Sequence, residues 1–466
     1  MIPLKSDVLR AGLLSSALGL AACSTLPTGV ADSQCRQRFE SLDARIDEAG
    51  VRDGGEARIE GFPYLRVNRF LASFRDEVAE GAAFETWVGH LRELDSRARR
   101  AELRNLNLPD WQGALAALDR CGEQLIQQEL ARSEAKQTLR ERAQVPDDYS
   151  TTARVFGAYA LTAPFLKSGI NNYQEEVRAQ YRQPLADVSR QLWRPAVAET
   201  LVGWTAVRDA LGLPRLSNEQ WQALAQTHAP EWSVETRGAY DRPGVPTLRN
   251  GQPAFDAAKP VVHFQPSYTR FGPRVLVQMN YIVWFSERPF ASEYDPYAGY
   301  LDGVIWRVTL DEQGQPLVYD TIHACGCYHY YFPVQALQQR TDAEYWQETA
   351  LVPQGTVPAG RPIVALQSAT HYVERVLPAM QASSENRYEL RPYSDLLSLE
   401  TGDGKHRSLF ADDGLIEGSE RGESQWLWMT GITSPGAMRQ WGRHATAFVG
   451  RAHFDEARAL ERTFVP

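Results

Sequence analysis

The segment 274-RVLVQMNYIVWF-285 predicts a long β-strand, because β-branched and aromatic residues dominate it and an FGP turn stands directly before it. Segments of the same character lie on both sides of it, at 261–265, 303–310, 316–323 and 328–332. Their connections are short, which favours an antiparallel meander, since parallel strands need a longer crossover. Further strands are expected at 362–367, 388–393, 425–429 and 444–450.

The first part of the chain predicts helices instead. Apolar residues recur at i, i+4, i+7 and i+11 in two stripes, which are Cys35, Phe39, Leu42 and Ile46, and Ala114, Leu118, Cys121 and Leu125. The sequence between residues 147 and 232 still has a mostly helical pattern, but prolines interrupt it. Its apolar run at 156–165 is too short to span a bilayer and suits a buried or an interfacial segment. The predicted class is α+β, with an N-terminal helical region followed by a C-terminal antiparallel β-rich domain.

Composition excludes several classes of function. The chain has 466 residues, with 49 Lys+Arg against 58 Asp+Glu and a formal charge of -9. No basic stripe is present that could neutralise phosphates, so we expect no nucleic-acid partner. No apolar run reaches the roughly 18 to 20 residues that cross a bilayer, so a polytopic membrane protein is not expected.

The N-terminus has the layout of an export signal: a charged start, an apolar stretch at 11–20, and small residues before a cysteine. The residues Leu20-Ala21-Ala22-Cys23 resemble the lipobox of bacterial lipoproteins. The resemblance implies that 1–22 are removed and that Cys23 becomes the lipidated first residue. Ser24 stands where the family's inner-membrane retention signal would place Asp, which implies the outer membrane and a body facing the periplasm. Attachment would then rest on acyl chains.

The expected organisation follows from these features. It is a lipoprotein signal peptide at 1–22, a linker at 23–34, a helical domain at 35–145, a proline-interrupted helical connecting region at 146–232, and a β-rich domain at 233–466.

With Cys23 lipidated, four cysteines remain in a compartment where disulfides persist. Cys35 and Cys121 lie on inward-facing helical stripes, so a Cys35–Cys121 disulfide is the simplest pairing. In the chain-entropy account, closing a loop of about 85 residues would stabilise the fold by about 4 to 5 kcal/mol. The alternative is a pair of buried free thiols, which pack as small hydrophobes.

The most informative short motif is 323-HACGCYH-329. If Gly326 sits at the tip of a tight turn, His323 faces His329 and Cys325 and Cys327 flank the tip. Directly opposed Cβ atoms in a hairpin lie about 4.5 to 5.5 Å apart, within chelating range. These four residues are therefore predicted to form a metal site, with zinc or copper as the ion. A Cys325–Cys327 disulfide and free thiols beside two hydrogen-bonded histidines are the alternatives.

The leading functional hypothesis is metal-assisted hydrolysis of an envelope polymer, a glycan or a peptide, at this site. Glu287, near a predicted strand end, is the candidate for proton transfer, and Asp302 is a second carboxylate that could act as base or orient a ligand. The segment 371-HYVE-374 lacks the second histidine of a zinc-protease signature and is not counted as a site. Two alternatives stay open: a non-catalytic envelope scaffold or binding lipoprotein with a structural Cys/His site, and a thiol-exchange or metal-handling protein using Cys325 and Cys327.

Overall fold

The computed structural model of the protein describes residues 30–197, 204, 206–340, 346–348, 350–380 and 386–466. Its α-helices are α1 (Val30–Ala49), α2 (Arg69–Ala72), α3 (Gly81–Asn105), α4 (Trp111–Glu129), α5 (Ser133–Arg142), α6 (Thr151–Phe156), α7 (Tyr159–Arg182), α8 (Asn218–His228) and α9 (Ser424–Leu427). Short 3-10 helices are η1 (Ala239–Asp241), η2 (Tyr393–Leu397), η3 (Trp428–Thr430) and η4 (Ala459–Arg462). The predicted signal peptide and the predicted lipidation site, Cys23, lie outside the described residues.

Four sheets are present in the described chain. The strands of the large sheet are β3 (Arg190–Pro195), β4 (Glu231–Glu235), β7 (Val261–Phe271), β8 (Arg274–Arg288), β9 (Gly299–Leu310), β10 (Pro316–His323), β11 (Tyr330–Pro333), β12 (Ile363–Leu366), β13 (Val373–Leu377) and β14 (Arg387–Pro392). The small sheets pair β1 (Ala57–Ile59) with β2 (Phe62–Val67), β5 (Val245–Arg249) with β6 (Gln252–Asp256), and β15 (Leu399–Glu400) with β16 (His406–Arg407).

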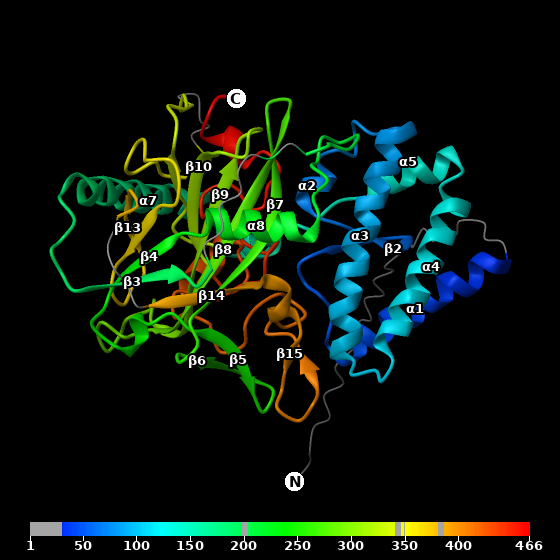
Figure 1. Ribbon diagram of the computed structural model, residues 1–466, viewed down its shortest axis with the longest axis horizontal. Coiled ribbons are helices and arrows are strands. Elements are labelled where there is room, and N and C mark those ends of the chain that lie inside the picture. Colours follow the sequence, from blue (N-terminus) through cyan, green and yellow to red (C-terminus); the bar gives the residue numbers. More distant parts are fainter. Residues whose placement is uncertain (1–29, 198–203, 205, 341–345, 349, 381–385) are drawn as a thin grey trace, which may run out of the picture.

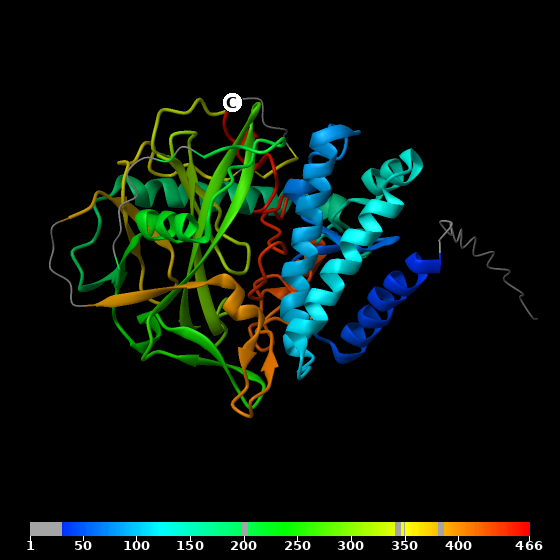
Figure 2. The same ribbon diagram turned by 45° about the vertical axis from the view of Figure 1, so that its right-hand side comes forward.

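The N-terminal helices form one end of the molecule, where α1, α3 and α4 stand side by side (Figures 1 and 2). The predicted apolar stripe of α1 is buried, and Phe39 and Ile46 are fully excluded from solvent. A disulfide joins Cys35 on α1 to Cys121 on α4, with their Cα atoms 5.3 Å apart. The predicted pairing is therefore confirmed, and it links two helices across a long stretch of chain.

The large sheet has the strand order β11-β10-β9-β8-β7-β14-β3-β4-β12-β13. The predicted meander is confirmed, because β7 to β11 pair antiparallel with their neighbours in chain order. The sheet as a whole is mixed, since β14 runs parallel to both β7 and β3, and β12 runs parallel to β4. Helices and strands thus combine in an α+β chain, and the sheet takes β3 from the segment expected to be a helical connection.

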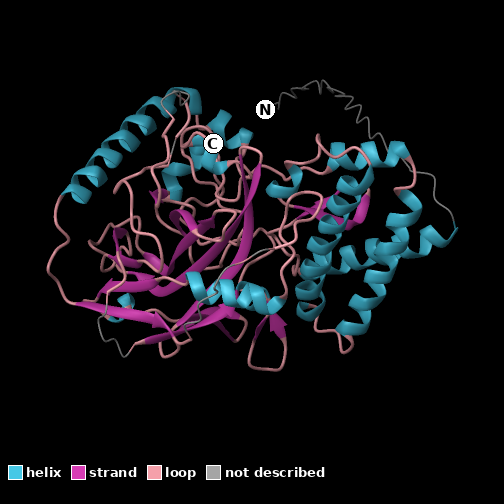
Figure 3. Ribbon diagram, turned by 45° about the horizontal axis from the view of Figure 1, so that its top comes forward, coloured by secondary structure: helices cyan, strands magenta, loops and turns pink. Residues whose placement is uncertain are grey.

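The two faces of the sheet are covered differently. Helices α7 and α8 pack on one face, where Val177, Leu224 and Ala225 share a core with Tyr281 and Trp306. Loops of the C-terminal part cover the other face, where Phe410, Ile416, Met438 and Phe454 pack on Ile282, Ile305 and Ile322. Figure 3 shows α7 as the long helix lying over the sheet, away from the N-terminal helices.

Two expected strands are not formed. Residues 425–429 belong to α9 and η3, and 444–450 have no strand, although Ala445 makes one antiparallel bridge to His453. Loops of this region instead pack their apolar side chains under the sheet, so burial there does not require strand pairing. No helix among the described residues has the length and apolar character needed to cross a membrane.

Candidate functional site

The 323–329 motif forms the predicted tight turn. The amide of His323 donates to the carbonyl of Cys327 at 2.9 Å, and the amide of Gly326 donates to the carbonyl of His323 at 2.8 Å. Gly326 has φ +96°, and a Cβ atom there would lie 2.4 Å from the carbonyl oxygen of Ala445. Only glycine fits this position, because both the conformation and the space exclude a side chain.

The register of this hairpin differs from the predicted one. Thr321 pairs with Tyr330, and the hydrogen bond at the turn joins His323 to Cys327. From Thr321 to His323 the first strand advances by two residues, whereas from Cys327 to Tyr330 the second strand advances by three, so the second strand contains one extra residue. Tyr328 has φ +64°, a left-handed conformation that nothing in its sequence neighbourhood signals. His323 therefore does not face His329, and the predicted arrangement of the two imidazoles is wrong.

The two histidines engage different partners. His329 Nε2 lies 2.9 Å from Asp320 Oδ2, whereas His323 Nδ1 lies 3.5 Å from Asp302 Oδ1. Asp320 and His323 are three positions apart on β10. Because successive side chains of a strand alternate between its faces, these two side chains lie on opposite faces of the sheet. The four predicted metal ligands are not brought together. Within the described ranges, no group of three or more His, Cys, Asp or Glu side chains is placed to hold a metal ion.

His329 belongs to a buried ion pair. The guanidinium of Arg307 donates to both oxygens of Asp320, at 2.9 and 2.5 Å, and the ring of His329 completes the carboxylate's partners. Burial lowers the pKa of His329 despite the nearby carboxylate, which keeps the imidazole neutral. This arrangement satisfies the polar groups of the sheet interior and leaves His329 a structural role.

His323 is part of a second buried network that sequence reasoning missed. Asp302 Oδ2 lies 2.7 Å from His371 Nδ1, and His371 Nε2 lies 3.7 Å from Asp241. The His371 ring stacks on Phe285 with centroids 3.8 Å apart. Burial opposes protonation of His371, but the carboxylates of Asp241 and Asp302 raise its pKa overall. The network thus places the His371 ring between two carboxylates that favour its protonated form.

Glu287 lies away from these networks. It is an exposed residue near the end of β8, opposite Tyr300 on β9. Its side chain is not part of any cavity wall described here, whereas Asp302, the other carboxylate considered from sequence, contacts His323 directly. The proton-transfer role of Glu287 stays a prediction, because neither of the two histidine networks includes its carboxylate.

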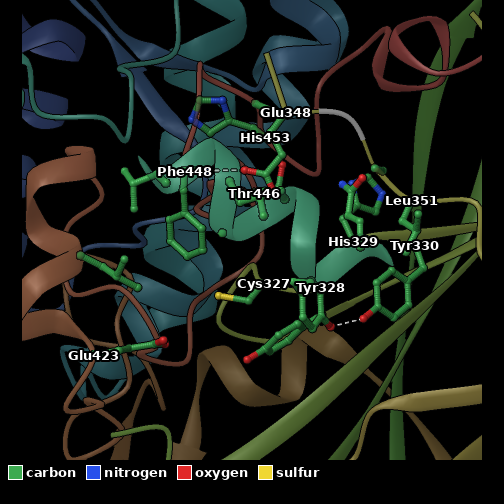
Figure 4. A pocket seen from close by; sticks show the side chains of 18 of the residues that line it. Cys327, Tyr328, His329, Tyr330, Glu348, Leu351, Glu423, Thr446, Phe448 and His453 are labelled. Carbon is green, nitrogen blue, oxygen red and sulfur yellow. Dashed lines mark hydrogen bonds between the residues drawn. The ribbon is translucent and has the colours of Figure 1, made fainter. Parts of the chain in front are cut away.

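A cavity of about 720 Å³ lies along the β11 edge of the sheet. Helix α7 supplies one wall through Phe165, Leu166, Gly169, Ile170 and Tyr173. The hairpin turn supplies another, and Figure 4 shows Tyr328 and Tyr330 facing the same space as Phe448 and Glu423. The hydroxyl groups of Tyr330 and Tyr173 hydrogen-bond to each other across the hairpin and α7.

Two carboxyl groups border this cavity. Burial raises the pKa of Glu348 to about 7, although the amides of Phe448 and Val449 bind its carboxyl oxygen. Burial also raises the pKa of Glu423 to about 7, against the nearby guanidinium groups of Arg288 and Arg421. A pKa of about 7 leaves each of these two carboxyl groups partly protonated near neutral pH, in a cavity whose walls are mainly apolar and aromatic but also include Arg462 and His453.

The mouth of the cavity is apolar. Phe165 lines the cavity and yet is 79% exposed, and Trp426 on the other rim is 43% exposed. The apolar surface continues along α6 and α7 through Val155, Phe156 and Leu161, each more than two-thirds exposed. Of the two interpretations of 156–165, the structure favours an interfacial segment over a buried one.

Comparisons of the chain with known protein families, with curated proteins and with solved structures find no match. We therefore infer the function from the geometry of the site. In class it is an apolar, partly enclosed cavity with a small number of polar groups, which is the usual character of a small-molecule binding site.

Proposed function

We propose that this protein is a lipid-anchored envelope protein whose α7 cavity binds an apolar, lipid-like ligand. The observation that supports the proposal is the cavity of about 720 Å³, whose lining includes the exposed apolar side chains of Phe165 and Trp426. Binding sites for organic ligands in proteins typically enclose about 300 to 1,000 Å³.

The exposed surface of α6 and α7 supports a ligand that comes from a membrane. Soluble monomers rarely present large apolar patches, and an exposed patch marks a place where another apolar phase or molecule is met. The lipobox resemblance at Cys23 would hold the protein close to a membrane, where a lipid could pass over this rim into the cavity.

The polar groups of the cavity favour an uncharged ligand. Glu348 and Glu423 can each donate or accept a hydrogen bond when protonated, and the hydroxyl groups of Tyr328 and Tyr372 do the same. Arg462 is the one arginine among the lining residues described, and it already pairs with Glu456. A ligand with a hydroxyl, carbonyl or amide group at one end of an apolar body suits these groups.

The test uses a glycine on α7. A Cβ atom at Gly169 would meet nothing within 4 Å, so Gly169→Trp places an indole in the cavity without a backbone clash. Binding of N-phenyl-1-naphthylamine, an uncharged apolar fluorophore, is expected to weaken at least tenfold. The matched control is Gly89→Trp, because Gly89 is also helical, exposed and without neighbours within 4 Å, but lies on α3.

Equal binding by the wild type and by the Gly169→Trp variant would contradict the proposal, as would equal loss in both tryptophan variants. The anchor is tested separately: a Cys23→Ser chain is expected to lose metabolic labelling by a palmitate analogue and to leave the membrane fraction. Labelling that persists in this variant would refute the lipobox interpretation.

The metal-dependent hydrolase predicted from the sequence stays a prediction. The arrangement of side chains supports it less than ligand binding, because His323 and His329 lie on opposite faces and each already has a carboxylate partner. Both functions assume the same location, attached by a lipid to a membrane of the cell envelope.

A further inference from the structure

The turn at 325–327 presents two free thiols at a fixed spacing. Cys325 and Cys327 are not joined by a disulfide, and the Cys325 thiol is near enough to raise the pKa of the buried Cys327 thiol. The turn cannot relax easily, because Gly326 is pressed against the backbone of Ala445 and the His323–Cys327 hydrogen bond closes the loop. Both sulfurs are thus preorganised on one rigid element.

A buried cation lies beside this pair. Arg439 is 4% exposed, and its guanidinium donates to the backbone carbonyls of Cys325 at 3.0 Å, Thr433 at 2.5 Å and Ser434 at 2.6 Å. Among the described residues no carboxylate forms an ion pair with Arg439, although the charge of Asp148 acts on it. A buried guanidinium whose hydrogen-bond partners are backbone carbonyls favours a further anion at the thiol pair.

A small cavity adjoins both sulfurs. Its volume is about 30 Å³, and its walls include Cys325, Gly326, Cys327, the loop at Ala445 and Glu348, whose carboxyl oxygen already accepts from the backbone amides of Phe448 and Val449. This space suits a single atom or ion and excludes an organic molecule. Cys327 also lines the larger α7 cavity, and its sulfur is visible there in Figure 4, so an ion can reach the pair from that side.

We propose that Cys325 and Cys327 bind one soft monovalent cation, Cu(I), as a two-coordinate bis-thiolate complex. Two thiols lose their protons to solvent, two sulfur–copper bonds form, and no electron is transferred. The two thiolates and one Cu(I) carry a net charge of minus one, which the guanidinium of Arg439 offsets. The proposal does not depend on the ligand of the α7 cavity.

The number of protein ligands available at the turn distinguishes Cu(I) from zinc. Zinc in structural sites is bound by four ligands arranged tetrahedrally, and no described His, Asp or Glu joins the two cysteines within reach of a common ion. Soft thiolate ligands favour Cu(I), which does not need four donors. The zinc predicted from the sequence therefore fits this turn less well than Cu(I).

The experiment uses the full chain carrying Cys23→Ser and prepared without reductant, so that Cys35 and Cys121 stay paired and two thiols are expected. Cu(I) is supplied anaerobically in competition with a chromophoric Cu(I) chelator. We expect one Cu(I) per chain with two sulfur ligands by X-ray absorption, and at least 100-fold weaker binding in Cys325→Ser and in Cys327→Ser. Arg439→Gln should weaken binding at least tenfold, whereas Arg439→Lys, which keeps the charge, should weaken it less.

His329→Gln is the matched control, because its amide can replace Nε2 toward Asp320 on the opposite face, and it should leave the Cu(I) affinity unchanged. Circular dichroism and a melting curve establish that each variant is folded. Retention of Cu(I) by a Cys325→Ser/Cys327→Ser chain would overturn the proposal. So would a thiol count of zero, which would indicate a redox-active disulfide, or a coordination shell that contains nitrogen.

Discussion

Glu423 is one of the two carboxyl residues beside the α7 cavity whose pKa burial raises. It is 6% exposed, and burial raises its pKa from the ordinary 4.5 to about 7. The native protein therefore holds a proton between pH 4.5 and 7 that the unfolded chain has released. Its contribution to the free energy of unfolding is fully present below pH 4.5 and is lost as the pH rises through 7.

The variant Glu423→Gln removes this dependence, because the amide stays neutral at all pH values. We expect equal stability of the variant and the wild type near pH 4.5, and a variant more stable by about 3 kcal/mol at pH 8. Urea unfolding at several pH values measures the difference. A difference that does not change with pH would show that Glu423 is ionised in the native protein.

Asp302 is the residue on which two buried imidazoles depend. It lies 2.7 Å from His371 and 3.5 Å from His323, and it is 2% exposed. Asp302→Asn should lower the free energy of unfolding by about 3 kcal/mol or more, since it removes one partner of a buried ion pair. Glu287→Gln, also near a β8–β9 strand end but exposed, should change it by less than about 0.5 kcal/mol. Equal urea midpoints for the two variants would contradict the described network.

At the scale of elements, the strand pattern was predictable and the pairing register was not. The bounds of β10 follow from a run of apolar residues between turn signals, and the structure has the same residues in that strand. The register failed because Tyr328 takes a left-handed conformation and adds one residue to the second strand. A shift of one residue moves a side chain to the other face, so His329 left the predicted site.

The candidate site was missed for a different reason. His371 and Asp302 are far apart in the sequence, as are Phe165 and Trp426, and no local periodicity links such positions. The pattern did identify the apolar character of 156–165, but only the packing of α7 along the β11 edge turned it into a cavity wall. The two helical stripes carried more information, because Cys35 and Cys121 each face inward on a regular helix and so could be paired.

Helix α7 contains a glycine that its packing does not require. Gly169 is exposed, and no atom lies within 4 Å of an added Cβ. Gly169→Ala should therefore raise the free energy of unfolding by about 0.5 to 1 kcal/mol, because alanine lowers the entropy lost on helix formation. Gly157→Ala, at the end of α6, should do the reverse, since its Cβ would lie 2.5 Å from Met429 Cβ. Chemical denaturation of both variants measures the contrast, and a stabilised Gly157→Ala chain would argue against the packing of α6 on η3.

At the scale of the whole molecule, polar contacts join the N-terminal helices to the C-terminal loop segment and to the segment before α6. Arg69 of α2 donates to Asp148 at 2.7 Å and to Asp455 at 3.1 Å, and His453 approaches Asp148 at 3.3 Å. The C-terminal segments that carry Asp455 and His453 run between the two parts in Figure 2. The helical end is therefore held by ion pairs that also involve the segment leading into α6.

The disulfide acts on this helical end. Cys35→Ala/Cys121→Ala should lower the free energy of unfolding by up to about 4 to 5 kcal/mol, because the open chain gains the freedom of a loop whose ends are 86 residues apart. Thermal melting should show the loss in the unfolding of the α1–α4 part. The double variant Cys325→Ala/Cys327→Ala, which also removes two cysteines, closes no loop and should cost less. A larger loss in that control would contradict the assignment of the stabilisation to chain closure.

The position of β14 in the sheet has a consequence for the growing chain. This strand pairs with β7 on one side and with β3 on the other, yet it comes later in the sequence than both. Until residue 392 has emerged, the meander and the β3–β4 group cannot join, and each presents an open edge with free backbone amides and carbonyls. During synthesis, the sheet of this protein is therefore completed only by its last third, and until then these two edges are open to pairing with strands of other chains.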